Sequence, residues 1–300
     1  MNITALVLTY NEEIHIERCL RSILPLTQQI VVVDSLSTDN TVKLARSLGA
    51  QVLERAWENN HSTQVNWALD QLPSTTDWIM RIDADEILTP QLVKQIQVLL
   101  PSLKDEVKGV SCIRKMVFQG KLIRYGGVGR NVVLRLFRFK FGRSESRWMD
   151  EHIKLSGSTT HLSGALIDDN LRPLSWWQEK HRNYAKREAV DLLNLEYQFL
   201  QKDRKSDESL TNSPIGLKRQ IKEGLYAKLP GGMRAAAYFA FRYFVLLGFL
   251  DGKQGSQFHY WQAFWYRNLA DQNVASVKKY MRENGLSAKE AIRIVLGISV

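Results

Sequence analysis

The chain has 300 residues and a mass of 34.5 kDa, a length typical of one large domain with an appended region. Hydrophobic residues make up 44% and charged residues 24%, close to the average of soluble globular proteins, which argues against a disordered chain, a collagen or a multi-span membrane protein. With only Cys19 and Cys112, and no signal-peptide pattern in its first residues, we expect a cytoplasmic protein.

The net charge of +10 is concentrated near the C-terminus. Residues 211–300 contain 13 Lys and Arg against 5 Asp and Glu, whereas residues 1–210 contain 28 against 26. Within residues 235–266, 12 of 32 side chains are aromatic. A basic, aromatic-rich region indicates either a nucleic-acid partner or an anionic membrane surface, and the rest of the sequence has to decide between them.

The first hundred residues alternate apolar, β-branched runs with amphipathic stretches, the pattern of βαβ units and a mostly parallel sheet. The expected strands are 3–8, 30–33, 51–54 and 77–82. The expected helices follow at about 12–24, 42–48, 61–72 and 90–100. Asn11 is the expected cap of the first of these helices, and Leu24 is expected on its buried face.

The pattern changes after residue 109. Two further strands are expected at 110–118 and 131–137, then an irregular segment after His152 and a long helix over about 176–201. Residues 202–214 are polar and read as a linker or mobile loop. We therefore expect a first domain over 1–201, divided into halves at residue 100, and a helical C-terminal region over 215–300.

The aromatic segment of the C-terminal region is too interrupted to cross a bilayer as one helix. Arg242 leaves uncharged pieces of 7 and 8 residues, whereas a spanning helix needs about 18–20. We interpret the segment as lying on a membrane surface, and the alternative is a helical pair packed on the main domain. The cations expected to meet headgroup phosphates are Lys228, Arg234, Arg242, Lys253 and Arg267.

Polar side chains follow three of the expected parallel strands, where ligands of open α/β sheets bind. These residues are Thr9, Tyr10, Asn11, Glu12, Asp34, Asp83 and Asp85. An aromatic ring, an isolated acid and a paired acid suit a nucleotide, with Asp83-Ala84-Asp85 supplying oxygen ligands for Mg²⁺ or Mn²⁺. The alternative for the acid pair is a solvated turn with acids at a helix N-terminus.

The same residues carry a family resemblance. The segments LVLTYNEEIHIERCLRSI, IVVVDSLSTDNTVKLARSLGAQVLE and WIMRIDADEIL, in this order, resemble the nucleotide-binding half of family 2 glycosyltransferases, most of all bacterial members that build lipopolysaccharide core and exopolysaccharide. The resemblance is strong over 1–100 and moderate over about 105–155. It implies an α/β fold of the GT-A type: a Rossmann-like, mostly parallel sheet with helices on both faces, with an acceptor half at 101–201.

The resemblance also implies the site: an inverting transfer from a nucleotide-diphosphate sugar, with Mg²⁺ or Mn²⁺ held at the Asp-x-Asp. Asp85 would be the principal metal ligand, Asp83 would face ribose and metal, and Asp34 would bind the base. Gln64 and Asn66 would neighbour the diphosphate. The residues implied to line the nucleotide-sugar site are Thr9, Tyr10, Asn11, Glu12, Asp34, Gln64, Asn66, Asp83 and Ala84.

Inversion in one in-line step requires a carboxylate to take the proton of the acceptor hydroxyl. In the family this base follows the second-half strands, and here Asp150 and Glu151 of WMDEHI match that place. Glu151 is the expected base and Asp150 the reserve; the alternative is that both are surface acids of a turn. The Gln-x-x-Arg-Trp motif of processive members is missing, which favours a single addition per encounter.

We therefore expect an enzyme of lipopolysaccharide or exopolysaccharide synthesis with a lipid-linked glycan acceptor, peripheral on the inner face of the cell membrane. A nucleic-acid-binding protein is the first alternative, but it leaves the acidic strand ends unexplained, so no nucleic-acid partner is expected. A catalytically inactive sugar-nucleotide-binding scaffold is the second, and it would tolerate Asp85→Ala without loss of function.

Overall fold

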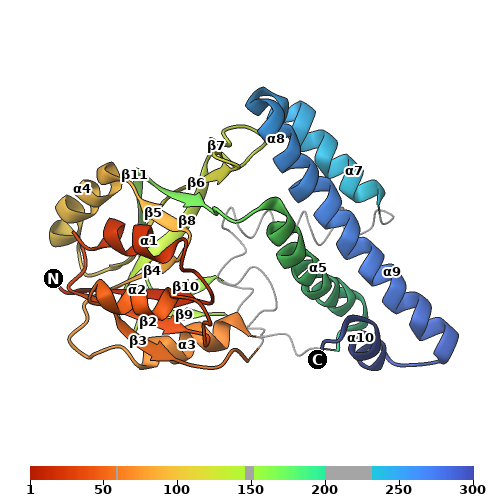
Figure 1. Ribbon diagram of the computed structural model, residues 1–300, viewed down its shortest axis with the longest axis horizontal. Coiled ribbons are helices and arrows are strands. Elements are labelled where there is room, and N and C mark those ends of the chain that lie inside the picture. The colour runs from red at the N-terminus through yellow and green to blue at the C-terminus, as the bar shows by residue number, and fades with distance from the viewer. Residues whose placement is uncertain (59, 146–151, 200–231) are drawn as a thin grey trace. The chain divides into compact units, whose positions relative to one another are not determined.

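The computed structural model describes residues 1–58, 60–145, 152–199 and 232–300 (Figure 1). Within these residues the chain forms two compact units, one up to Leu171 and one from Arg172 onward. The helix α5 (Leu174–Tyr197) belongs to the second unit, although the sequence placed it in the first domain, because its apolar face packs on the C-terminal helices. The expected linker, 202–214, lies outside the described residues.

The first unit is built on a large mixed sheet with the strand order β3-β2-β1-β4-β8-β6-β11-β5, and β7 pairs with β6. The first four strands are parallel, as expected, whereas β8, β5 and β7 are antiparallel to their neighbours and β11 is parallel to β6. A separate antiparallel pair joins β9 and β10. The strands are β1 Ile3–Thr9, β2 Gln29–Asp34, β3 Gln51–Glu54, β4 Trp78–Asp83, β5 Glu86–Leu88, β6 Val107–Phe118, β7 Lys121–Leu122, β8 Asn131–Arg138, β9 Gly142–Ser144, β10 Ile153–Leu155 and β11 Ser158–Asp169.

Helices cover both faces of this sheet, which confirms the expected α/β class. One face packs against α1 (Ile16–Ile23), α2 (Thr41–Ser47) and α4 (Pro90–Leu99), and the other packs against α3 (His61–Asp70). Local signals set these helices: the side chain of Thr89 caps α4 ahead of Pro90. Because β1 and β2 are covered on both sides, they read as continuous apolar runs.

Three local expectations are wrong. The segment after His152 contains the twelve-residue strand β11, whose first half is polar and lacks a clear alternation. Asn11 does not cap α1; its φ of 53° is left-handed and its side chain accepts from Thr38. Leu24 is 42% exposed because it follows the last helical residue, outside the buried face of α1.

The second unit is helical. Its core joins α5, α9 and α10 through small and branched side chains, among them Ala189, Val277 and Ile292. Its remaining helices, besides α5, are α7 Met233–Ala240, α8 Gly252–His259, α9 Tyr266–Asn284 and α10 Ala288–Leu296, with π-helical turns at Phe241–Val245 and Tyr260–Trp265. Within this unit α8 lies at the far end from α10, where α7 meets α9 (Figure 1).

Two of the cations that the sequence assigned to headgroups are not at the surface. Arg234 is buried and binds the carboxylate of Asp271, and Arg242 is buried and donates to Gln262 Oε1 at 2.6 Å. The expectation is wrong for both because burial between helices keeps them from a membrane. Arg267 is also engaged, in an ion pair with Glu188 at 2.7 Å. Lys253 is exposed, and Lys228 lies outside the described residues.

Candidate active site at the carboxyl ends of the parallel strands

The polar residues predicted at three strand ends come together at one edge of the sheet. Thr9 at the end of β1 is paired in register with Asp34 at the end of β2. On the other side of β1, Leu8 is paired with Asp83 at the end of β4. Because parallel neighbouring strands end on the same edge, the register brings the three predicted segments side by side.

Asp34 is fully buried and fixes the turn that follows it. Its Oδ2 accepts from Thr9 Oγ1 at 2.7 Å and from Ser37 Oγ at 2.6 Å, and its Oδ1 accepts from the Ser37 amide at 2.7 Å. These bonds satisfy a carboxylate that burial would otherwise penalise. Asp34 therefore acts first on the shape of the turn after β2, and Ser37 completes its hydrogen bonds.

The loop after β1 is locked to the same turn. The Asn11 amide donates to Ser37 Oγ at 2.7 Å, and Asn11 Oδ1 accepts from the Thr38 amide at 2.8 Å. Tyr10 stands beside them with 59% of its surface exposed. The loop thus presents an open aromatic ring on a rigid backbone, an arrangement suited to a planar ligand.

Glu12 is linked to a residue that the sequence did not single out. Its Oε2 lies 2.5 Å from Nδ1 of His15, which is fully buried, and Nε2 of His15 accepts from the Leu171 amide at 2.9 Å. Because Nε2 accepts, the neutral ring carries its proton on Nδ1 and donates it to Glu12. His15 therefore ties the loop after β1 to the segment that follows β11.

Asp83 lies between two guanidinium groups. Arg81 and Arg135 each donate to its carboxylate at 3.0 Å, and Arg135 also binds the buried Glu86. Burial would raise the pKa of Asp83, but the charges of Arg81 and Arg135 outweigh it and hold that pKa well below its usual range. Asp83 is therefore ionised at neutral pH.

Asp85 has a different environment. Its Oδ2 accepts from Asn170 Nδ2 at 3.0 Å, and its backbone carbonyl accepts from the Asp169 amide at 3.1 Å. Asp168 lies nearby; burial and the charge of Asp85 raise the pKa of Asp168 to about 8, against the effect of Arg114. The sequence missed Asp168, Asp169 and Asn170 because it missed β11, although an Asp-Asp-Asn run was a visible signal.

The acids fit a divalent metal that is shared with a ligand. Oδ1 of Asp85 accepts no hydrogen bond within the described part of the chain, and carboxylate oxygens are the donors that Mg²⁺ and Mn²⁺ prefer. Over the same part of the chain, no group of three or more His, Cys, Asp or Glu side chains could hold a metal ion alone. One or two carboxylates would therefore leave most coordination positions to phosphates and water.

Of the remaining predicted residues, some lie at this edge of the sheet and others hold neighbouring elements together. Gln64 is buried, and its Nε2 lies 3.4 Å from Ser35 Oγ in the turn after β2. The side-chain amide of Asn66 donates to the Ser144 carbonyl and accepts from the Ser144 amide, each at 2.9 Å, and so joins α3 to β9. Ala84 is buried between the two acids. Asp150 and Glu151 lie outside the described residues.

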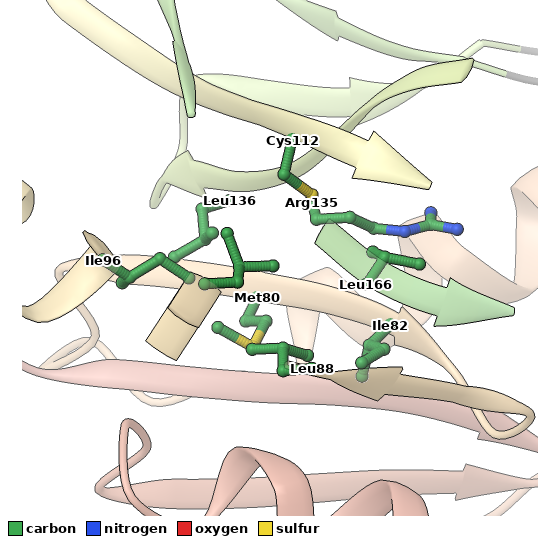
Figure 2. A pocket seen from close by; sticks show the side chains of 9 residues that line it. Met80, Ile82, Leu88, Ile96, Cys112, Arg135, Leu136 and Leu166 are labelled. Atoms are coloured by element: carbon green, nitrogen blue, oxygen red, sulfur yellow. The ribbon is translucent and has the colours of Figure 1, made fainter. Parts of the chain in front are cut away.

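Arg135 reaches the acids from the core. Its side chain lines a small void formed otherwise by apolar residues of the sheet and α4, among them Met80, Ile82 and Leu166 (Figure 2). The guanidinium extends away from this apolar cluster (Figure 2). A void of this kind offers no polar partner to a ligand, so we assign it to imperfect packing around the Arg135 stem.

Comparisons with known proteins agree with this geometry. A family model described as Glycosyl transferase family 2 matches residues 4–159. An uncharacterised glycosyltransferase of Rickettsia prowazekii is 33% identical over 64% of this chain and 68% of its own length, and one of Rickettsia typhi is 33% identical over 46% and 47%. The lipopolysaccharide core biosynthesis glycosyltransferase LpsC of Rhizobium meliloti is 32% identical over 57% and 64%.

Among solved structures, glucosyl-3-phosphoglycerate synthase of Mycobacterium tuberculosis, in complex with Mn²⁺, uridine diphosphate and glucosyl-3-phosphoglycerate, matches 38% of this chain and 44% of its own with 25% identity and a TM-score of 0.33. The match to the Rickettsia typhi relative spans about half of that protein. Because the family model covers more than half of the chain and contains all three strand ends, the chain belongs to glycosyl transferase family 2.

Proposed function

We propose that this glycosyltransferase moves a sugar from a nucleotide-diphosphate donor to a glycan acceptor with inversion at the anomeric carbon. The observation that carries the proposal is the convergence of the Thr9–Asp34 pair and of Asp83 and Asp85 at adjacent parallel strand ends. The exposed ring of Tyr10 suits the base, and the acids suit the metal-bound diphosphate.

Asp85 is the proposed metal ligand, with Asp83 beside it. Mg²⁺ or Mn²⁺, when bound, would offset the negative charge that develops on the leaving diphosphate. The chain's own contribution is preorganisation. Arg81 and Arg135 keep Asp83 ionised and in place, and Asn170 orients Asp85 by occupying one carboxylate oxygen.

Glu151 is the proposed base that takes the proton from the acceptor hydroxyl, with Asp150 as the reserve. The support comes from the described residues on either side. The Glu145 amide donates to the His152 carbonyl at 3.0 Å, and β9 pairs with β10 in register, Ser144 opposite Ile153. Asn66 fastens Ser144 to α3, so both ends of the segment that contains the base are anchored to the first unit.

The proposed acceptor is a lipid-linked glycan of lipopolysaccharide or exopolysaccharide synthesis, and the proposed location is the inner face of the cell membrane. The similarity to a relative named for lipopolysaccharide core biosynthesis supports the first part. The proposed reaction adds a single sugar per encounter, which the missing Gln-x-x-Arg-Trp motif supports.

The test is turnover of a panel of UDP-, dTDP- and GDP-sugars with Mn²⁺ or Mg²⁺, in the wild type and in Asp85→Asn. We expect metal-dependent turnover of one donor, lowered at least about 100-fold in Asp85→Asn. Asp105→Asn is the matched control, because Asp105 is 97% exposed and lies away from the strand ends. Donor binding without turnover under any condition would indicate the inactive scaffold instead, and no binding at all would overturn the proposal.

The base is tested with the same donor. Glu151→Gln should lower turnover with little change in donor affinity, because the base acts on the acceptor rather than on the nucleotide. Asp150→Asn is the matched control. If Asp150→Asn alone abolishes transfer, the two roles are exchanged; if neither substitution slows it, the base lies elsewhere.

A further inference from the structure

The second unit carries a compact apolar tip, which we define as residues 241–250. Six of these ten residues expose large apolar side chains: Phe241, Phe244, Val245, Leu247, Phe249 and Leu250, with exposed fractions between 42% and 65%. Water-soluble proteins rarely expose this many large apolar side chains within ten residues, and those that do use them to contact another molecule or a membrane.

The polarity of this region is reversed relative to a water-soluble fold. The polar side chains Arg242, Asp251 and His259 are at most 4% exposed, while the apolar side chains face outward. The π-helical turn of 241–245 sends Arg242 inward, where its guanidinium lies 5.6 Å from the ring centroid of Phe258 and donates to Gln262. Burying a charge costs free energy that an aqueous surface would avoid, so the outward apolar face needs its own explanation.

The backbone of the tip is set by tight packing. Leu247 has a left-handed φ of 59°, unusual for a branched residue, and it ends the first arm of the turn. A Cβ on Gly248 would come within 2.6 Å of the His259 ring, and one on Gly255 within 2.1 Å of Asp251 Cβ. The exposed apolar side chains are therefore held outward by a fixed turn.

The charges around the tip suit an anionic surface. Within residues 235–266, Lys253 is the one Lys, Arg, Asp or Glu that is exposed, since Arg242 and Asp251 are buried. No exposed carboxylate of this segment would therefore repel phosphate headgroups. In the described part of the chain no single helix could cross a bilayer, although Met233–Val245 and Gly248–Asn284, bent by 71°, pass that test as a pair on length and composition.

We infer that the apolar tip inserts into one leaflet of a phospholipid bilayer, with Lys253 at headgroup level, and that this contact rather than a surface of arginines attaches the protein to the membrane. The inference rests on the membrane location proposed above but not on the donor chemistry. Insertion removes the six apolar side chains from water. It also explains why the turn has apolar side chains outside and polar side chains inside.

The first experiment reports on the tip directly. Cys19 and Cys112 are both buried, so Val245→Cys in the full chain provides one reactive thiol for an environment-sensitive NBD label. We expect a blue shift with phosphatidylcholine vesicles and a stronger one when phosphatidylglycerol is added. Ile294→Cys, on the exposed face of α10, is the matched control and should show no shift. Faster reduction of the Val245 label by dithionite trapped inside the vesicles than by dithionite added outside would place the tip across the bilayer and overturn the one-leaflet contact.

The second experiment measures affinity by vesicle flotation. The double variant Phe244→Ser, Val245→Ser should bind at least tenfold more weakly to both lipid compositions, and Ile294→Ser should bind like the wild type. Lys253→Gln should lose only the gain that phosphatidylglycerol provides. Wild-type binding by the double variant would overturn the inference. A second outcome would also overturn it: a wild type that is a dimer and does not bind vesicles, and a double variant that is a monomer. That result would assign the tip to contact with a second copy of the chain. Donor binding in detergent-free buffer is measured in parallel. Normal donor binding alongside a failed vesicle experiment would contradict the inference about the tip and not the proposed activity.

Discussion

Both units bury charged side chains, but they use them differently. In the first unit Asp83, Glu86 and Arg135 form a network at the carboxyl ends of the strands, and 36% of the Asp83 side chain still faces solvent. In the second unit Arg234 and Asp271 form a pair in which both side chains are less than 10% exposed. The first network is open to a ligand on one side, whereas the second pair is sealed between two helices.

This difference shows why charge composition misleads about function. The C-terminal third is the basic part of the chain, yet its arginines mostly join helices: Arg234 to Asp271, and Arg267 to Glu188, which also accepts from Tyr266 at 2.6 Å. At the strand ends Asp83 and Asp85 are only partly buried, so a ligand can reach them. Accessibility of the partnered group, rather than the number of charges, separates the two uses.

The largest effects are expected from removing one arginine in each unit. Arg135→Met leaves Glu86 buried without its cation, and Arg234→Met does the same to Asp271. Each should lower the free energy of unfolding by about 3–5 kcal/mol, measured by urea denaturation. Only Arg135→Met should also weaken donor binding, measured by calorimetry on the folded fraction, because it releases Asp83 as well.

Arg143→Met is the control for both variants. Arg143 pairs with Asp70 on the surface, with more than half of each side chain exposed, and its removal should cost less than about 1 kcal/mol. Equal losses of donor binding in Arg135→Met and Arg234→Met would contradict the division between an open and a sealed network.

The pH dependence of stability should run in opposite directions in the two units. The pKa of Asp168 is raised to about 8, so its contribution is present below about pH 4 and is lost as the pH rises through 8. Burial lowers the pKa of His181 to about 4, so its contribution is present above about pH 6.5 and is lost as the pH falls through 4. The effect should be on the order of 5 kcal/mol for Asp168 and on the order of 3 kcal/mol for His181.

Urea denaturation between pH 4 and pH 9, with a chelator present, checks both directions. Asp168→Asn should flatten the alkaline loss and leave the acid side unchanged, whereas His181→Gln should flatten the acid loss alone. An Asp168→Asn variant whose alkaline loss matches the wild type would mean that Asp168 is ionised in the native state well below pH 8.

The sequence predicted most of the first unit because its signals are local and repeated. Apolar runs such as Ile30–Val33 alternate with amphipathic helices, and a parallel sheet then places Thr9, Asp34 and Asp83 at one edge. The strand β11 escaped detection because its first half is polar. Asn170, which follows β11, was not predicted for the same reason, and its contact with Asp85 spans 85 positions of sequence.

The second unit was harder to predict for a physical reason. In a hydropathy pattern Arg242 breaks the apolar segment and is expected at the surface. In the structure the π-helical turn directs its side chain into the helical unit. Whether a helical residue faces in or out depends on the neighbouring helix, and the partners of Arg234 and Arg242 lie 37 and 20 residues away. Composition therefore indicated a surface of cations where the structure has a surface of apolar side chains.

A smaller effect is expected at Asn170. Asn170→Ala removes the hydrogen bond to Asp85 Oδ2 and lets that carboxylate rotate, so the metal concentration needed for half-maximal turnover should rise about tenfold. Turnover at saturating metal should change little, which distinguishes a positioning role from loss of a ligand. Asn170→Asp should be worse than Asn170→Ala, because it adds a charge beside Asp85 and Asp168. Normal metal dependence in Asn170→Ala would show that Asp85 is held by other contacts.

The smallest expected effect concerns one leucine in each unit. Each has an exposed leucine in the left-handed region: Leu36 after β2, with a φ of 63°, and Leu247 in the apolar tip, with a φ of 59°. Asparagine adopts this conformation more readily, so Leu36→Asn and Leu247→Asn should each raise the free energy of unfolding by about 0.5–1 kcal/mol. Strained backbone positions cluster at binding regions, so we expect both leucine side chains to contact a ligand or a membrane.

Leu36→Asn should therefore stabilise the protein while weakening donor binding, and Leu247→Asn should stabilise it while weakening binding to vesicles. Gln119, also left-handed with a φ of 49°, provides the control, since Gln119→Asn should affect neither ligand. Denaturation, donor calorimetry and vesicle flotation on the same three variants decide the matter. If both leucine variants gain stability and keep both binding activities, the two strained turns reflect only chain geometry, and the parallel between the strand ends and the tip fails.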